Sequence, residues 1–422
     1  MELFNKNKKL FDSKLIVDLN RNLNKKREII YKESFIVKKH FLGASPPEIF
    51  VGRYNYPNVN AGILSPNFFE NVEELSIPEI WHERKFSIEQ VLEKRRKLVY
   101  GRFKTKIKGS NFRSKFNIGN KFLSLMQELA NAYKPVSTEF FLKNLPKNNF
   151  EINRFSPIIT NQAQLEYVRL QENPKIKRKV DYLTSDDEVK ASVAVNELYN
   201  YGINISSINK ILSAGLLGLK TSRKLVPTRW SITAVDDGIA KNLLDKIRYY
   251  SEINDILVFN SEYNGNHYEI LLLPGNYSFE VIEAEIKEII KINGLGFNSF
   301  DNFDVKFWQD YERFHGRRDY ANEVIGAYYA NRLALCEYLE RIKKQATAIF
   351  FREIFNYYAP LGVGILRETC REAFSKSPEK FDSLEEAFEV IQSRLKINTD
   401  IFREKSVLLK EYGKQKKLRE WF

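Results

Sequence analysis

The stretch Ile256-Leu-Val-Phe-Asn-Ser-Glu-Tyr263-Asn264-Gly265-Asn266-His267-Tyr-Glu-Ile-Leu-Leu-Leu273 decides the fold class of this chain. Its two halves are rich in β-branched, aromatic and other apolar residues, a composition typical of strands. Between them, Asn264 and Gly265 tolerate the positive φ angles that a tight hairpin turn requires. The stretch therefore predicts two paired strands, Ile256–Tyr263 and His267–Leu273, within an antiparallel sheet that is backed by helices.

Helical patterns lie on both sides of this hairpin, and one further strand is predicted at Trp230–Val235. Ser87 with Gln90 and Ser185 with Glu188 have the spacing of capping boxes, and Ser206 is expected to cap a shorter helix. Capping signals and apolar periodicity predict helices over 87–101, 121–133, 185–202, 206–215, 324–342, 363–374 and 384–395. The predicted class is α+β, with a central antiparallel sheet region and flanking helices, followed by a mainly helical C-terminal region.

The length of the chain allows more than one domain. It has 422 residues, of which 43% are hydrophobic, so it is able to bury a substantial core. We expect a basic N-terminal segment over 1–40, an α+β domain over 41–300, a helical domain over 301–410 and a charged tail over 411–422.

The composition favours an anionic partner. Lys and Arg number 67 against 54 Asp and Glu, which gives a formal charge of +13. Such an excess favours nucleic acid, a membrane surface or an acidic protein, although a solvated lysine surface is the alternative. The two cysteines are too few for a disulfide framework, and neither a membrane span nor a signal peptide is evident. We therefore expect a cytoplasmic protein that does not bind a membrane.

A basic segment without acidic residues runs from Lys94 to Gln127. In its middle, cations alternate with other residues, so a strand would place them together on one face. A row of cations at this spacing suits a phosphate backbone, and a solvated strand face is the alternative. The candidate nucleic-acid-binding residues are Arg102, Lys104, Lys106, Lys108, Arg113 and Lys115.

Candidate chemistry lies in the polar segment Lys224–Asp237. Arg229 is suited to binding a phosphate or carboxylate. Asp236 and Asp237 are candidates for a general base or for holding a metal such as Mg²⁺. Capping of a helix that begins near Ile239 is the alternative for at least one of these aspartates.

Two further polar clusters stand out. Arg53, Tyr54, Asn58 and Asn60 lie in a loop bounded by Pro and Gly, which suits either a binding surface or a loop that satisfies its own backbone. The segment His315–Tyr320 precedes the long predicted helix. The common phosphate-loop, nucleophile-elbow, zinc-protease and dinucleotide motifs are absent from the sequence.

The last eight residues form a compact recognition pattern. Gln415, Leu418, Trp421 and Phe422 have the spacing i, i+3, i+6, i+7, so one 3₁₀-like turn places the three apolar side chains on one face. Two adjacent aromatics supply most of the apolar area that binding requires. A turn that docks on its own domain is the alternative. The pattern resembles the peptide by which archaeal and eukaryotic proteins bind the trimeric sliding clamp (PCNA).

Longer motifs resemble one protein family over most of the chain. Ser45-Pro-Pro-Glu-Ile-Phe-Val-Gly-Arg-Tyr54 is followed by Tyr56-Pro-Asn-Val-Asn60, and Leu225-Val-Pro-Thr-Arg-Trp-Ser-Ile-Thr233 by Asp236-Asp237. Leu271-Leu-Leu-Pro274 and Tyr357-Tyr-Ala-Pro-Leu-Gly362 complete the set. Together these segments resemble the archaeal Nre DNA-repair family.

The resemblance implies a larger N-terminal part, a smaller helical C-terminal part and a role in DNA repair through the clamp. Many members begin with a cysteine-rich segment that looks metal-binding, whereas 1–40 here contains no cysteine. We therefore expect no N-terminal zinc or iron–sulfur site. The resemblance implies no particular reaction. An enzyme that processes DNA or a nucleotide, with Arg53, Arg229, Asp236 and Asp237 in its pocket, a non-catalytic DNA-binding adaptor and a pure protein-interaction factor all remain open.

Overall fold

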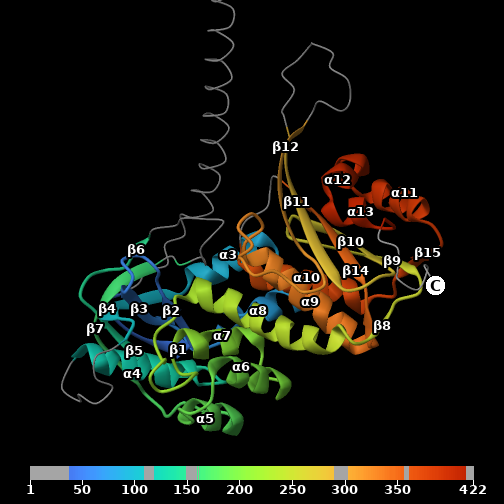
Figure 1. Ribbon diagram of the computed structural model, residues 1–422. Helices are drawn as coiled ribbons and strands as arrows, with labels where there is room; N and C mark the ends of the chain where they lie inside the picture. Colours follow the sequence, from blue (N-terminus) through green and yellow to red (C-terminus); the bar gives the residue numbers. More distant parts are fainter. Residues whose placement is uncertain are drawn as a thin grey trace, which may run out of the picture. The chain divides into compact units, whose positions relative to one another are not determined.

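The predicted hairpin belongs to the second of two sheets in the computed structural model, which describes residues 38–108, 118–148, 159, 161–288, 303–355 and 361–414. From Lys39 onward the chain forms one compact unit, and Met1–Lys38 is a separate unit of which only Lys38 is described. Helices lie between and around the two sheets (Figure 1). The predicted α+β class is confirmed.

The hairpin is formed by β9 (Ile256–Tyr263) and β10 (Asn266–Leu273) as predicted. Its turn residues Asn264 and Gly265 have φ of 48° and 78°, the positive values that this turn requires. The six-stranded sheet has the order β12-β11-β14-β10-β9-β15, and only the β11–β14 pair is parallel. The other strands are β11 (Ser278–Glu288), β12 (Phe303–Glu312), β14 (Thr347–Ile354) and β15 (Glu379–Phe381).

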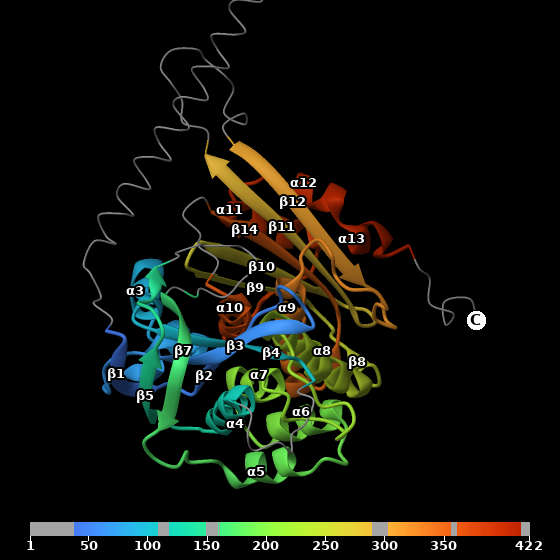
Figure 2. The same ribbon diagram turned by 90° about the vertical axis from the view of Figure 1, so that its left-hand side faces the viewer.

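Apolar side chains cover both faces of this sheet. One face packs against α8 (Thr228–Ile247), α9 (Gly326–Ile342) and α10 (Val363–Ser375), through residues such as Phe259, Phe279 and Leu333. The other face packs against α11 (Leu384–Arg394), α12 (Thr399–Lys405) and α13 (Val407–Glu411). Figure 2 shows α11–α13 on the outer side of the sheet. The helices predicted at 324–342, 363–374 and 384–395 are confirmed as α9, α10 and α11.

The predicted division of the chain near residue 300 falls between β11 and β12. These two strands pair antiparallel over their whole length, so the second sheet takes strands from both sides of that point. Separate domains at 41–300 and 301–410 stay a prediction.

The first sheet is formed by the N-terminal half of the described chain. Its order is β1-β5-β7-β4-β3-β2, with the short β6 beside β7, and only the β4–β7 pair is parallel. Helix α4 (Ile118–Ala130), predicted at 121–133, packs on one face and places Phe122 5.6 Å from Phe103 of β4. The strands are β1 (His40–Ser45), β2 (Glu48–Val51), β3 (Asn58–Ser65), β4 (Val99–Lys106), β5 (Val136–Leu142), β6 (Lys147–Asn148) and β7 (Asn161–Leu170).

The strand predicted at Trp230–Val235 is wrong, because this segment is the start of the long helix α8. Its alternating large and small residues resemble a strand, yet Trp230 is 45% exposed and Ser231, Val235 and Asp236 are buried. Burial therefore follows the helical period and not the period of two. Pro227 at the N-cap fits this start, since proline has a φ suited to the beginning of a helix.

Three predicted helix boundaries are also wrong. The helix after Ser87, α3 (Ile88–Arg96), ends before Gly101, and that glycine lies in β4, where a Cβ atom would come 2.6 Å from the Phe140 ring. Ser185 ends α5 (Arg178–Ser185) and caps nothing, because α6 (Ala191–Asn200) begins later. Asn204, and not Ser206, caps α7 (Ile205–Ser213) by accepting the Ser207 N–H at 2.7 Å.

The remaining elements are short. They are η1 (Val72–Leu75), α2 (Pro78–Glu83), and the strand pair β8 (Ser251–Glu252) with β13 (Lys344–Gln345). Among the described residues, no helix is long and apolar enough to cross a membrane.

Glu74 ties η1 to α2 and α3, the helices that border the site described below. Its carboxylate pairs with Arg84 and Lys94, and its carbonyl oxygen accepts the indole N–H of Trp81 at 2.6 Å. The hydrogen bond from Lys94 lowers the pKa of Glu74, and the charges of Lys94 and Arg84 lower it further against the effect of burial.

We expect Glu74→Gln to destabilise the protein at neutral pH, because the amide loses both ion pairs. A lowered pKa stabilises the fold above the unfolded-state value of about 4.3, and this contribution disappears as the pH falls through the folded-state value. Urea unfolding should therefore show a deficit at pH 7 that shrinks towards about pH 3. Glu73→Gln, at the exposed neighbour, is the matched control. A deficit that does not change with pH would contradict this account.

Candidate functional site

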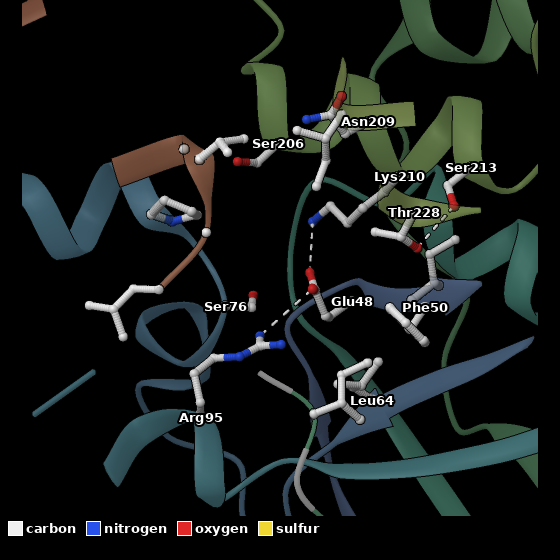
Figure 3. A pocket seen from close by; sticks show the side chains of 18 of the residues that line it. Glu48, Phe50, Leu64, Ser76, Arg95, Ser206, Asn209, Lys210, Ser213 and Thr228 are labelled. Atoms are coloured by element: carbon white, nitrogen blue, oxygen red, sulfur yellow. Dashed lines mark hydrogen bonds and ion pairs between the residues drawn. The ribbon is translucent and has the colours of Figure 1, made fainter. Parts of the chain in front are cut away.

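A cavity of about 110 Å³ lies where β2, α3, α7 and the first turn of α8 meet (Figure 3). Glu48 and Phe50 line it from β2, Thr228 from α8, and Gly362 from the segment before α10. These residues belong to three of the motifs that stand out in the sequence, at 45–54, 225–233 and 357–362. Segments far apart in the chain therefore converge on one cavity.

Thr228 joins two of these segments. Its hydroxyl accepts a hydrogen bond from the Val51 N–H at 2.9 Å and lies 3.2 Å from the Ser213 hydroxyl. Because Thr228 is the first residue of α8, this contact fixes the start of that helix against the end of β2.

Three charged side chains meet at the cavity (Figure 3). One carboxylate oxygen of Glu48 lies 3.7 Å from Arg95 Nη1, and the other lies 3.9 Å from Lys210 Nζ. Arg95 and Lys210 are 5% and 8% exposed, which is unusual for cations. Two buried cations therefore share one carboxylate, and Arg95 Nη1 also donates to the Leu75 carbonyl oxygen at 3.3 Å.

Burial shifts the protonation of all three groups. It raises the pKa of Glu48 and lowers the pKa values of Lys210 and Arg95, since each charged form loses its water. The opposite charges of the partners act against each of these shifts. Perturbed groups that share a cavity are a common mark of a functional site.

Two neutral side chains at the cavity lack partners among the described residues. The hydroxyl of Ser76 and the side-chain oxygen of Asn209 are buried, and neither makes a hydrogen bond there. A buried polar atom without a partner is costly, so such groups usually mark a place for water or a ligand.

Asp236, a predicted candidate for chemistry, is a structural ion-pair partner behind the cavity. It is fully buried and accepts a hydrogen bond from Arg367 Nη1 at 2.8 Å. Burial raises the pKa of Asp236, and the charge of Arg367 opposes the shift. Arg367 itself lines the cavity.

Asp237 faces different neighbours. It pairs with Arg332 of α9 and with Lys241 at 2.7 Å. Both aspartates lie inside α8, so helix N-capping, the alternative considered for them, is wrong. Nor do the described residues bring together three His, Cys, Asp or Glu side chains that could hold a metal.

Arg53 and Arg229 lie near each other on the surface, beside the start of α8. Burial lowers the pKa of Arg229, and the positive charge of Arg53 lowers it further. Exposed aromatic rings lie beside these arginines or next to them in the sequence. Arg53 lies 5.4 Å from the Tyr54 ring, and the rings of Tyr56 and Trp230 are 5.3 Å apart. Of the predicted candidates, the structure therefore places Arg53 near Arg229. Asp236 pairs instead with Arg367, and Asp237 with Arg332.

The predicted cation row is present on β4. Phe103 is buried, whereas Lys104 and Lys106 are exposed and Arg102 is half-buried. Arg102 donates a hydrogen bond to Gln162 at 3.2 Å. Lys108 follows the strand and is exposed. The strand predicted for this segment is thus confirmed, with its cations on one face.

The structure does not place the other predicted residues at the cavity or on the cation row. Arg113, Lys115 and the terminal peptide with Gln415, Leu418, Trp421 and Phe422 fall outside the described residues. In the 315–320 cluster, Arg317 donates to the buried Asp310 at 2.8 Å and to main-chain oxygens, so it holds a loop together.

Sequence reasoning assigned no functional role to the polar residues of the cavity, among them Ser76, Arg95, Asn209 and Lys210, and it quoted Glu48 only as part of a motif. No local signal marks Asn209 and Lys210, because two polar residues between Ile208 and Ile211 are ordinary in an amphipathic helix such as α7. Ser76 and Arg95 carry no such signal either, since nothing in the sequence separates Arg95 from the other cations of its basic segment, such as the exposed Lys104 and Lys106.

Comparison with known proteins gives matches to one family over most of the chain. The archaeal Nre N-terminal domain matches residues 20–290, and the archaeal Nre C-terminal domain matches residues 312–421. The DNA repair protein NreB of Archaeoglobus fulgidus is 34% identical over 386 residues, covering 91% of this chain and 93% of that protein.

Two proteins named DNA repair protein NreA are similar as well. That of Haloferax volcanii is 32% identical over 87% of this chain and 86% of its own length. That of Archaeoglobus fulgidus is 36% identical over 85% of this chain and 86% of its own length. No solved structure matches the chain.

We expect Asp236→Asn to unfold the protein more easily, because it leaves Arg367 buried without its counter-charge. Removal of one partner from a buried ion pair costs about 3 kcal/mol of unfolding free energy. Urea unfolding should show this loss, and Asp245→Asn, on an exposed residue of the same helix, should show almost none. Equal stabilities of the two variants would remove the structural role assigned to Asp236.

Proposed function

The chain belongs to the archaeal Nre family, and on this premise we propose that it acts in DNA repair by binding DNA through the first sheet and the sliding clamp through its terminal peptide. The names of its relatives, all DNA repair proteins, support the role. Such a role places the protein with the chromosome in the cytoplasm.

The observation that carries DNA binding is the row of cations on an open sheet face. Lys106 pairs with Asn58 of β3, Lys104 with Asn60, and Arg102 with Gly62. Directly opposite residues in a sheet share a face, so these cations lie among amide side chains and a glycine. Such a face meets phosphates with charge and hydrogen-bond donors, and no acidic side chain stands in these three pairs.

The arginine–aromatic cluster supports contact with unpaired bases. Tyr54, Tyr56 and Trp230 are 68%, 42% and 45% exposed, and Arg53 and Arg229 lie beside them. Large exposed rings next to guanidinium groups provide the stacking surface on which single strands are commonly bound. The cluster adjoins the cation row, since the Ile107 N–H donates to the Pro57 carbonyl at 3.0 Å. We therefore assign the whole surface to a DNA strand with unpaired segments.

Clamp binding rests on the sequence of the last eight residues. Leu418, Trp421 and Phe422 supply an apolar plug, and the cations among them keep such a peptide in water when it is unbound. The peptide would hold the protein at the clamp while the first sheet contacts DNA nearby.

Two mechanisms fit this role, and the cavity favours an enzyme. A half-buried carboxylate between a buried lysine and a buried arginine is a constellation for proton transfer or for binding a reacting phosphate. Asp236 and Asp237 are engaged with arginines, so we assign neither of them a metal. The alternative is a non-catalytic adaptor that links the clamp to other repair factors. Turnover of a DNA substrate that is lost in Glu48→Gln would separate the two.

We expect Trp421→Ala combined with Phe422→Ala to abolish clamp binding, because the double substitution removes most of the apolar plug. Calorimetric titration of the full-length protein with the trimeric clamp measures the effect. The fold, followed by thermal unfolding, should not change. Lys416→Ala with Lys417→Ala, between the anchors, is the matched control and should retain most of the affinity. Unchanged affinity of the aromatic double variant would refute the assignment.

We expect Lys104→Gln with Lys106→Gln to weaken binding to single-stranded DNA of any sequence. Each lost phosphate contact should reduce the slope of log K against log salt by about 0.7. Fluorescence anisotropy at several salt concentrations gives both quantities. Lys306→Gln with Lys410→Gln changes the net charge equally on exposed residues of the second half and should have little effect. Identical slopes in the two double variants would show that the row makes no phosphate contact.

A further inference from the structure

We propose that the cavity at Glu48, Arg95 and Lys210 binds a phosphate monoester, namely the terminal phosphate of a DNA strand whose backbone follows the cation row on β4. The proposal rests on DNA binding by the first sheet and adds the part of the DNA that the cavity recognises.

Hydrogen-bond donors at the cavity carry the proposal. Lys210 has three N–H bonds, and its ion-pair contact is Glu48 at 3.9 Å, beyond hydrogen-bond range. The Ser76 hydroxyl has no partner among the described residues. Both groups are more than nine-tenths buried and line the same cavity. Figure 3 shows the ammonium of Lys210 and the guanidinium of Arg95 approaching Glu48 from opposite sides. An anion with several oxygens satisfies such donors.

The charges at the cavity are close to balanced, so hydrogen-bond donors and not net charge argue for the ligand. Arg95 and Lys210 lie beside Glu48, and the charge of Glu79 also acts on Lys210. Arg367, the third cation at the cavity, pairs with Asp236 and lies 3.8 Å from Glu79. A phosphate monoester brings a charge of about −1.5 to −2 at neutral pH and three acceptor oxygens. The side-chain oxygen of Asn209, which has no partner among the described residues, can accept a hydrogen bond from the sugar or from a water molecule.

The size of the cavity limits what enters it. A cavity of about 110 Å³ holds a phosphate together with several water molecules. A volume of this size admits a free nucleotide as well as a strand end, and the test below distinguishes the two.

The register of the first sheet connects the cavity to the cation row. Glu48 of β2 lies opposite Leu64 of β3, and Phe50 lies opposite Gly62, which lies opposite Arg102 of β4. Phe50 at the cavity and Arg102 in the row therefore share one sheet face, with a glycine between them. Two strand spacings separate them by about 10 Å. A strand of DNA covers that distance in about three nucleotides at 3.4 Å each.

The test compares oligonucleotides that differ only at one end. Fluorescence anisotropy with the full-length protein measures the affinity for single strands that carry a 5′-phosphate, a 3′-phosphate or hydroxyls at both ends. We expect one of the phosphorylated ends to bind about tenfold more tightly than the hydroxyl end, a factor typical of one or two charge-assisted hydrogen bonds. Lys210→Met should abolish this preference while retaining the affinity for hydroxyl-ended DNA.

Two further variants guard against a folding defect. Ser76→Ala removes a hydroxyl that has no partner in the described part of the chain, so it should leave the unfolding midpoint unchanged and still reduce the preference. Lys410→Met, on the exposed face of α13, is the control for the loss of a lysine. Retention of the full preference in both Lys210→Met and Ser76→Ala would overturn the assignment.

The remaining outcomes distinguish this proposal from the wider one. Equal affinities of the wild type for phosphate and hydroxyl ends would overturn the end site and leave DNA binding intact. No binding of any oligonucleotide would overturn DNA binding itself. If deoxynucleoside monophosphate binds the wild type and not Lys210→Met, and the end preference is absent, the site serves free nucleotides and the DNA-end assignment is wrong.

Discussion

The buried ion pair between Asp236 and Arg367 is the constraint on which the rest of the site depends. It joins the middle of α8 to α10, both of which pack on the second sheet. The start of α8 places Thr228 against β2, and the segment before α10 places Gly362 at the cavity. Because a buried charge without a partner is very unfavourable, the two helices are held in one relative position. This fixed pair of helices sets the cavity wall opposite the first sheet.

The same physical rule makes the three charges at the cavity unusual. Asp236 and Arg367 meet at 2.8 Å, whereas the Lys210 ammonium lies 3.9 Å from Glu48. Groups that act only as structural supports usually close to hydrogen-bond distance when buried, because nothing else replaces the lost water. The long Lys210–Glu48 contact, beside a Ser76 hydroxyl and an Asn209 oxygen that have no partner among the described residues, has the character of a site that is completed by something else.

The sequence predicted features that local chemistry determines and missed those that depend on tertiary packing. Asn264-Gly265 fixed the hairpin, because few residues accept two successive positive φ angles. Trp230–Val235 misled, because its alternation matches a strand and only packing shows that Trp230 faces solvent. The cation row on β4 was predictable from alternation. Lys210 was not assigned, because nothing local to α7 shows that its ammonium meets Glu48 across the fold.

The positions of the cavity and of the arginine–aromatic cluster explain why the motifs at 45–54 and 225–233 stand out in the sequence. Ser45–Tyr54 supplies β2 with Glu48, and the loop that follows supplies Arg53 and Tyr54. Leu225–Thr233 supplies Thr228 to the cavity and places Arg229 and Trp230 on the surface. Each motif therefore contributes both to the buried cavity and to the exposed arginine–aromatic cluster. Motifs that served packing alone would have no reason to carry exposed Tyr54 and Trp230. On the proposal made above, the two surfaces would be parts of one site, in which a strand that stacks on the outer cluster has its charged end directed inward.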